Sequence, residues 1–569
     1  SQWEGGISMG ETCERRQHYG EILEHLKTYF PVPVSNPIMD GYFIHTISNF
    51  LDRVDNLKSA APLLGAGQKR HYELSFDEQF PEGMSSVEKV TELLVDYCQG
   101  MTIWAHPNAQ VNVVPPPTIP SITAAIAGAI YNPNIIWDEY SARFAEAEIQ
   151  VVALLSNLIN YNPQQSGGFF TFGGTGTLLY GCKVAIEKLF GGRTMREGIR
   201  EDVKIVASDS SHYSRLNIAG WLGLGTKNLV SIPTTGNNEM SLTALESYLR
   251  QAFKSGEKVA LIIATVGTTD AFGIDDVAAI VRLRNQLASE YQLDYLPHVH
   301  GDAVIGWVWS VFRDYDFESN PLGFHARTLR SLQDSLQQIS GLHLADSVGV
   351  DFHKTGYAPY ISSVFLIKNR DDLTVLSREP EQMPYLYQFG SYRPGLYTLE
   401  CSRSGSSALA ALANIQLFGK QGYRALIGHV VEMSEMLRER VERHPFIHVL
   451  NHYNYGSVTL FRVYPKEVDA KEAFKRELTD PNYREQLEKH NLYNRRIFDC
   501  VHQRAMRGEG VLLSWTDSYQ RARYPDGLAI AALKSFIMSP WTNLSAVEMV
   551  VRQVLEAQTE VEMNGKFPS

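Results

Sequence analysis

The feature that most constrains the fold is a long alternation between short β-branched runs and amphipathic stretches, which extends over residues 121–420. The apolar runs lie at residues 203–207, 229–232, 260–266, 298–304 and 362–367. Strands that alternate with helical patterns are typical of parallel βαβ units, and near-continuous apolar runs indicate strands buried on both faces. We therefore predict an α/β fold with a mostly parallel sheet covered by helices.

Two other zones flank this alternation in the chain of 569 residues. Residues 1–120 read as interrupted helices and end in the breaker run 114–120 (Val-Pro-Pro-Pro-Thr-Ile-Pro). Residues 421–569 combine a helix pattern at 423–442 with strand-like runs at 457–464 and 511–516 and a last helix after Pro540. We predict an N-terminal helical segment (1–120), a large α/β domain (121–420) and a smaller C-terminal α+β domain (421–569).

Composition argues against several partners. The 52 Lys and Arg residues and 63 Asp and Glu residues give a net charge of −11 without a basic cluster, so we do not expect nucleic-acid binding. The apolar runs are shorter than the roughly 20 residues that span a bilayer, so we expect no membrane span, and the first residues lack the pattern of a secretory signal. We interpret the five widely spaced cysteines as buried thiols in a reducing compartment, which favours the cytoplasm.

A glycine-rich turn at residues 173–177 (Gly-Gly-Thr-Gly-Thr) lies between an apolar run and a helical pattern at 178–189. Backbone amides of such a turn can converge on an anion at the start of a helix. The turn has neither the dinucleotide fingerprint nor the Lys-Ser/Thr pair of a P-loop. Alone it indicates a phosphate site and a simple tight turn equally well.

Two further positions carry charge where strands are expected to end. Asp302 follows an apolar run, where a buried carboxylate needs a positive partner to stay ionised; a helix cap is the alternative. Lys354 lies in a short loop after His353, and a lysine among apolar and cationic neighbours can lose its proton and react with an aldehyde. A solvated loop lysine is the alternative.

The order of these motifs resembles the group II pyridoxal-5′-phosphate (PLP) amino-acid decarboxylases, which include glutamate, aromatic amino-acid and tyrosine decarboxylases. The resemblance covers about residues 95–560. It rests on 104–107 (Trp-Ala-His-Pro), 173–177, 211–214 (Ser-His-Tyr-Ser), 264–269 (Ala-Thr-Val-Gly-Thr-Thr), 300–304 (His-Gly-Asp-Ala-Val), 351–357 (Asp-Phe-His-Lys-Thr-Gly-Tyr), 385–388 (Tyr-Leu-Tyr-Gln) and 400–405 (Glu-Cys-Ser-Arg-Ser-Gly).

The resemblance implies fold type I, the aminotransferase-like fold, with a seven-stranded sheet. It also implies a site for PLP. Lys354 would bind the cofactor covalently, Asp302 would keep the pyridine nitrogen protonated and His212 would stack on the ring. The remaining cofactor-binding candidates are Gly174, Thr175 and His353 around the phosphate, with Thr269 nearby.

The resemblance further implies a homodimer whose active site lies at the subunit interface and takes an amino-acid substrate. We expect residues 376–393 to form a mobile loop, because they have no sustained period and contain Pro380, Pro384 and Gly390. Tyr385 on this loop would protonate the α-carbon after carbon dioxide leaves. Tyr387 is the alternative donor, and packing at the dimer interface is the structural alternative for Tyr385.

Several positions depart from the family pattern. The stretch between Asp302 and Lys354 is long, and we interpret residues 324–339 as an inserted helix, either inert or shaping the entrance. Val304 stands where a second alanine is common, and Gly176 where an acidic residue is frequent. Lys534 stands where the glutamate-specific branch has an arginine for a substrate carboxylate, and lysine lacks the bidentate fork of arginine.

These observations predict a PLP-dependent L-amino-acid decarboxylase, with an aromatic substrate favoured. A related PLP reaction, such as decarboxylation coupled to oxidative deamination or carbon–carbon lysis, is the first alternative, because fold resemblance does not fix the reaction. A non-catalytic homologue is the second alternative. The presence of Lys354, Asp302 and His212 together argues against it.

Overall fold

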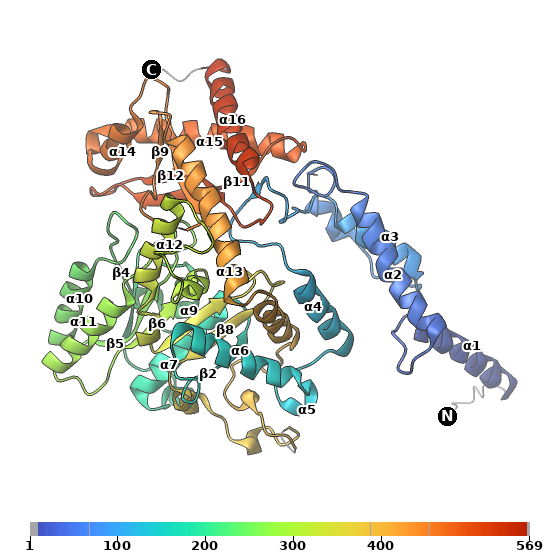
Figure 1. Cartoon of the computed structure of the whole chain (residues 1–569). Helices are drawn as coiled ribbons and strands as arrows, with labels where there is room; N and C mark the ends of the chain where they lie inside the picture. Colours follow the sequence, from blue (N-terminus) through green and yellow to red (C-terminus); the bar gives the residue numbers. More distant parts are fainter. Residues whose placement is uncertain (1–8, 68, 387–388, 455, 566–569) are drawn as a thin grey trace, which may run out of the picture. The chain divides into compact units, whose positions relative to one another are not determined.

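The computed structural model describes residues 9–67, 69–386, 389–454 and 456–565 (Figure 1). The chain divides into two compact units. The first comprises Ser1–Thr102 with Met506–Glu509, and the second comprises Ile103–Ala505 with Gly510–Ser569.

The first unit is helical in its described residues. Its elements are α1 (Met9–Lys27), α2 (Pro37–Asp55), the 3-10 helix η1 (Tyr72–Asp77) and α3 (Val87–Tyr97). Helix α2 begins at Pro37 because the Asn36 side chain accepts hydrogen bonds from the backbone N–H groups of Ile38 and Met39. No residue of α2 is buried within the described chain. Among the described residues, no helix is long and apolar enough to cross a membrane.

A seven-stranded sheet forms the centre of the second unit. Its strands lie in the order β2 (Gly167–Thr171), β8 (Ser363–Ile367), β7 (Ser347–Asp351), β6 (His298–Asp302), β5 (Lys258–Thr265), β3 (Val203–Ser208) and β4 (Leu229–Ile232). Strand β8 is antiparallel to β2 and β7, and the other neighbours are parallel. The predicted α/β fold with a mostly parallel sheet is confirmed.

Helices cover both faces of this sheet (Figure 1). Strand β5 shows why, because Leu261 and Ile263 belong to one buried cluster whereas Ile262 and Ala264 belong to another. A strand buried on both faces needs the unbroken apolar run seen in the sequence. The first cluster contains residues of α7 (Gly174–Phe190) and α9 (Ser214–Trp221). The second contains residues of α6 (Phe144–Ile159), α10 (Leu242–Lys254), α11 (Val277–Glu290) and α12 (Ala326–Ile339).

A second sheet follows the order β1 (Ala109–Gln110), β11 (Leu512–Arg521), β12 (Ala529–Phe536), β10 (Val458–Val463) and β9 (Ile447–Val449). Its helices are α13 (Ser406–Val441), α14 (Ala470–Thr479), α15 (Arg484–Met506) and α16 (Leu544–Met563). The remaining α-helices are α4 (Ile119–Tyr131), α5 (Asp138–Ser141) and α8 (Thr194–Glu197). The expected boundaries after residues 120 and 420 fall inside α4 and α13, and α13 is kinked at Gly419 (φ +53°).

Helix α12 occupies the segment that we interpreted as an insertion. It buries Leu332 and Ile339 and packs against α13 and the 3-10 helix η3 (Gly306–Phe312). Arg327 of α12 donates a hydrogen bond to Glu435 of α13 at 2.6 Å. The helix therefore joins α13 to η3, which follows strand β6 of the larger sheet.

The cysteines differ from the prediction of five buried thiols. All five are free, but only Cys182 is buried, and Cys13 and Cys401 are exposed. Sequence spacing excludes a disulfide framework but does not report the burial of single thiols, which depends on tertiary packing.

Candidate active site

Two neighbouring parallel strands end in carboxylates. Strand β6 ends at Asp302 and strand β7 ends at Asp351, with Asp302 in register with Gly349. Carboxyl ends of parallel strands meet at one edge of a sheet, where ligands of open α/β folds bind. The loop that carries His353 and Lys354 begins at this edge, directly after β7.

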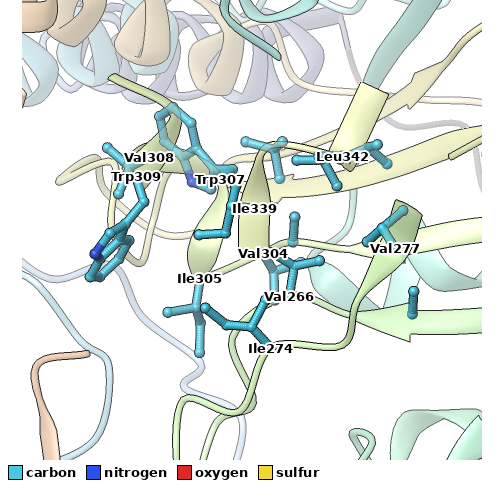
Figure 2. Close-up of a cluster of buried hydrophobic side chains, with 14 of the residues drawn as sticks. Val266, Ile274, Val277, Val304, Ile305, Trp307, Val308, Trp309, Ile339 and Leu342 are labelled. Atoms are coloured by element: carbon cyan, nitrogen blue, oxygen red, sulfur yellow. The ribbon is translucent and has the colours of Figure 1, made fainter. Parts of the chain in front are cut away.

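Direct hydrogen bonds fix the two strand ends relative to each other. Trp307 Nε1 donates to the carbonyl oxygen of Asp351 at 3.0 Å, and Thr355 Oγ1 donates to the carbonyl oxygen of Ile305 at 2.8 Å. Figure 2 shows the buried cluster around this segment, with Val304, Ile305 and Trp307 among its members. The positions of Asp302 and Lys354 therefore depend on a packed core rather than on free loops.

Lys354 is largely buried and lies 3.0 Å from Asp351, measured from Nζ to Oδ2. Burial lowers the pKa of Lys354, but the negative charge of Asp351 outweighs it and the net pKa is raised. The solvated-lysine alternative is therefore wrong. Lys354 is a buried ammonium with a carboxylate partner.

Asp302 is buried, and its Oδ1 has no hydrogen-bond partner within the described chain. Burial raises the pKa of Asp302 to about 6, and the positive charge of Lys354 acts in the opposite direction. The helix-cap alternative is wrong, because Ile305 precedes η3 and no side chain caps that helix. A buried carboxylate oxygen without a donor fits a protonated pyridine nitrogen.

The glycine-rich turn connects β2 to α7. Gly173 has φ +100°, a conformation that favours glycine, and α7 begins at Gly174. A Cβ atom at Gly174 would lie 3.2 Å from Asp351 Oδ2 and 3.3 Å from Val304 Cγ1, so the turn closes on the strand ends. Thr175 follows and is half-buried. A helix start without side-chain bulk fits a phosphate group.

The side chain of Thr171 explains why a glycine stands at position 176, where an acidic residue is frequent in the family. A Cβ atom at Gly176 would lie 2.6 Å from Thr171 Oγ1. Thr171 is held in place because it donates a hydrogen bond of 2.6 Å to Glu400. A larger residue at position 176 would displace Thr171 from this contact.

His212 and Thr269 line one cavity of about 640 Å³. Nδ1 of His212 accepts a hydrogen bond from the backbone N–H of Ser214 at 3.1 Å, which fixes the ring. Burial, together with the positive charge of Lys354, lowers the pKa of His212 to about 4. His212 is therefore neutral at neutral pH and is suited to stacking on an aromatic cofactor.

The structure does not bring Tyr385 to the other candidates. Tyr385 lies in a turn after the 3-10 helix η6 (Pro380–Gln382) and is 75% exposed, whereas Lys354 is largely buried. Its alternative, Tyr387, lies outside the described residues. The role of Tyr385 stays a prediction.

Three features of the site were not assigned from the sequence. Asp351 is the partner of Lys354, and the ring of Tyr360 packs against His353 in a tilted arrangement, with centroids 4.2 Å apart. Lys534 is buried and lies 2.8 Å from Asp270. Asp351 ends an apolar run just as Asp302 does, so the same signal was available for it. The other two pairings join distant or looped segments and leave no local signal.

Comparisons with known proteins identify a family for the chain. A family model described as the pyridoxal-dependent decarboxylase conserved domain matches residues 70–307 and 323–463. Residues 308–322 are left unmatched between the two segments, and α12 lies within the second matched segment.

Sequence and structure relatives are also found. L-2,4-diaminobutyrate decarboxylase of Acinetobacter baumannii is 24% identical over 402 residues, which are 68% of this chain and 72% of the relative. L-tyrosine decarboxylase of Enterococcus faecium is 28% identical over 288 residues, 46% of each chain. The structure of Oryza sativa TDC with PLP and tryptamine superposes with a TM-score of 0.73 at 16% identity, covering 93% of this chain and 99% of that chain.

Proposed function

The chain belongs to the pyridoxal-dependent decarboxylase family and is a PLP-dependent amino-acid carboxy-lyase, and from its geometry we propose that Lys354 binds the cofactor covalently and that Asp302 faces its ring nitrogen. The observation that carries the proposal is the edge shared by β6 and β7. There the Asp302 Oδ1 lacks a donor and Lys354 lies buried beside Asp351. Bound PLP supplies an electron-accepting ring for the carbon that loses carbon dioxide.

The residues of this chain have separate tasks. Gly174, Thr175 and His353 surround the phosphate at the start of α7. Asp302 holds a proton on the ring nitrogen, because a carboxylate in a buried site stabilises a neighbouring cation. The neutral ring of His212 covers the cofactor face, and Thr269 lies next to it in the same cavity. Packing around these groups excludes water and orients the bond that breaks.

An aromatic amino acid is our first candidate substrate. Lys534, a buried cation of β12, has the cavity residue Asp270 as its partner, so it is not free to bind a second substrate carboxylate. Tyr213 and Tyr519 line the cavity beside His212 and offer aromatic contacts. The similarity to a tyrosine decarboxylase supports this choice.

A substrate with a cationic side chain is the second candidate. Asp209 and Asp270 both line the cavity, with Arg521 and Arg523 also in its wall. Burial raises the pKa of Asp209, and a substrate ammonium would stabilise its charged form. The similarity to a diaminobutyrate decarboxylase supports this alternative.

We also propose that the enzyme is a homodimer. Helix α4 exposes Ile119, Ile122 and Ile126, and α2 exposes Ile38 and Ile44. Rows of exposed large apolar side chains on helices are typical of surfaces covered by another chain. Sedimentation velocity tests this proposal, since a protein that remains monomeric at micromolar concentration contradicts it. The free cysteines favour a reducing compartment, and we propose the cytoplasm.

The reaction is tested with purified protein, PLP and separate samples of L-tyrosine, L-2,4-diaminobutyrate and L-glutamate. Carbon dioxide, amine, aldehyde and peroxide are quantified by mass spectrometry and a peroxidase assay. Amine from tyrosine supports the first candidate, and amine from diaminobutyrate alone supports the second. Aldehyde with peroxide shows oxidative deamination instead, and efficient use of glutamate contradicts the assignment of Lys534.

A further inference from the structure

Asp351 is a buried carboxylate at the end of β7 whose two oxygens have different surroundings. Its Oδ1 accepts a hydrogen bond of 2.6 Å from Ser363. Its Oδ2 lies 3.0 Å from Lys354 Nζ and 3.4 Å from His353 Nε2. Apart from these two ionic contacts, Oδ2 is buried without a further hydrogen-bond partner in the described chain.

The same oxygen of Asp351, Oδ2, faces the glycine-rich turn. A Cβ atom added to Gly174 would lie 3.2 Å from Oδ2 and 3.8 Å from the carboxyl carbon. Gly174 is the first residue of α7, where we place the phosphate of the cofactor. A carboxylate therefore lines the same cradle as a group that carries close to two negative charges above about pH 6.

Two adjacent anions in a buried site repel each other unless a proton or a cation lies between them. We propose that Asp351 makes cofactor binding proton-coupled: one proton from solvent is taken up and bridges Asp351 Oδ2 and a phosphate oxygen. This inference rests on the proposed phosphate site. The proton bonds to oxygen and no other bond breaks, and the covalent attachment of Lys354 releases water while leaving its positive charge in place.

The other titratable groups near Asp351 do not take this proton. The groups that interact electrostatically with Asp351 are His212, Asp302, His353, Lys354 and Tyr360. Burial lowers the pKa of both histidines, so they stay neutral at neutral pH and above. The pKa values of Lys354 and Tyr360 are raised, so both keep their protons there.

Asp302 is the remaining group with a proton nearby. Its pKa of about 6 leaves it ionised above neutral pH, and it serves the ring nitrogen rather than the phosphate. Protonation of that nitrogen adds a second contribution to proton uptake, but this contribution does not depend on Asp351. A comparison of the wild type with Asp351→Asn therefore isolates the proton at the phosphate, because asparagine has nearly the same shape without the charge.

The test measures proton uptake when apoprotein binds PLP, by titration calorimetry at about pH 8 in two buffers with different ionisation heats. The wild type should take up about one proton more than Asp351→Asn. Between about pH 7.5 and 9, the dissociation constant of the wild type for PLP should therefore rise about tenfold more per pH unit than that of Asp351→Asn. At the upper end of this pH range, Asp351→Asn should bind PLP more tightly than the wild type. Equal uptake in the two proteins would overturn the proposal.

Pyridoxal, which lacks the phosphate, is the matched ligand. Wild-type protein should take up about one proton less with pyridoxal than with PLP, and this comparison stands even if Asp351→Asn does not fold. His353→Gln should take up the same number of protons as the wild type. If the extra proton uptake disappears in His353→Gln but persists in Asp351→Asn, the proton lies on His353 and the proposal is contradicted. Borohydride trapping distinguishes failure of the proposed cofactor site from failure of the proton coupling. An unlabelled Lys354 refutes the proposed site. A labelled Lys354 with equal proton uptake in the wild type and Asp351→Asn refutes only the proton coupling.

Discussion

Lys534 on β12 lies 2.8 Å from Asp270 in the loop after β5, and thereby connects the smaller sheet to the large one. The second carboxylate oxygen of Asp270 accepts a hydrogen bond from Thr516 at 3.1 Å. The lysine side chain is 3% exposed, whereas the aspartate side chain is 44% exposed. The pair therefore buries its cation more deeply than its anion.

This asymmetry predicts unequal effects of breaking the pair. Asp270→Asn leaves a buried ammonium without its counter-charge and should lower the free energy of unfolding by about 2–3 kcal/mol. Lys534→Met leaves a half-exposed carboxylate and should cost less, about 1 kcal/mol, since water and salt screen it. Urea unfolding of both variants measures the difference, with Thr516→Val as the control for the remaining hydrogen bond. A larger loss in Lys534→Met than in Asp270→Asn would contradict the assigned burial.

Asp302→Ala should separate cofactor binding from turnover. The phosphate contacts and Lys354 remain, but the ring nitrogen loses the carboxylate that stabilises its proton, so turnover should fall by about a hundredfold or more. Bound PLP is measured by visible absorption after gel filtration, and turnover by carbon dioxide release. Full activity in this variant would show that the buried carboxylate at the end of β6 is structural.

Acid sensitivity should come in part from two buried histidines on β6. His298 Nε2 and His300 Nδ1 each lie 2.7 Å from Ser347 Oγ, and burial lowers the pKa of both to about 3. The unfolded chain binds protons at these sites below about pH 6.5 whereas the folded chain does not, so stability falls as the pH drops from about 6.5 towards 3. Each histidine contributes a slope of up to about 1.4 kcal/mol per pH unit.

His300→Gln should therefore reduce the slope of the free energy of unfolding against pH in this range, because the unfolded variant binds about one proton fewer than the unfolded wild type. The measurement is urea unfolding at several pH values, with the exposed His71→Gln as the control. Parallel pH profiles for the wild type and His300→Gln would contradict the assignment.

Much of the fold followed from the sequence because the central strands carry their own signal. The apolar run 229–232 coincides with β4, and the run 203–207 lies within β3. Strand β1 was not predicted, because its two residues are ordered by pairing with Leu512 and Leu513 on β11. The first half of α13 was also missed, since Gly405 and the small residues that follow it lack a clear apolar period.

In the candidate site, too, some residues were indicated by the sequence, whereas other contacts depend on tertiary packing. Asp302 and Lys354 follow apolar runs in the order typical of the family, and the structure places them at neighbouring strand ends. The contact of Asp351 with the glycine-rich turn depends on how β7 and α7 pack, and the pairing of Lys534 with Asp270 joins residues far apart in the chain. Only a folded chain brings these groups together.

The proton donor to the α-carbon is tested by product analysis. If Tyr385 donates this proton, Tyr385→Phe should still consume substrate but release aldehyde, ammonia and hydrogen peroxide in place of part of the amine, because the unprotonated carbon is oxidised by molecular oxygen and the product is hydrolysed. The amine-to-aldehyde ratio is measured in air and under nitrogen, with Tyr387→Phe beside it. An unchanged ratio and rate in Tyr385→Phe would remove Tyr385 from the mechanism.

The central claim is that Lys354 binds the cofactor, and one measurement tests it most directly. The holoenzyme is reduced with borohydride, digested and mapped by mass spectrometry. The account predicts a pyridoxyl group on Lys354 in the wild type, loss of the visible absorption on reduction, and no label at this position in Lys354→Ala. A pyridoxyl group on another lysine of the wild type, with Lys354 unmodified, would contradict it.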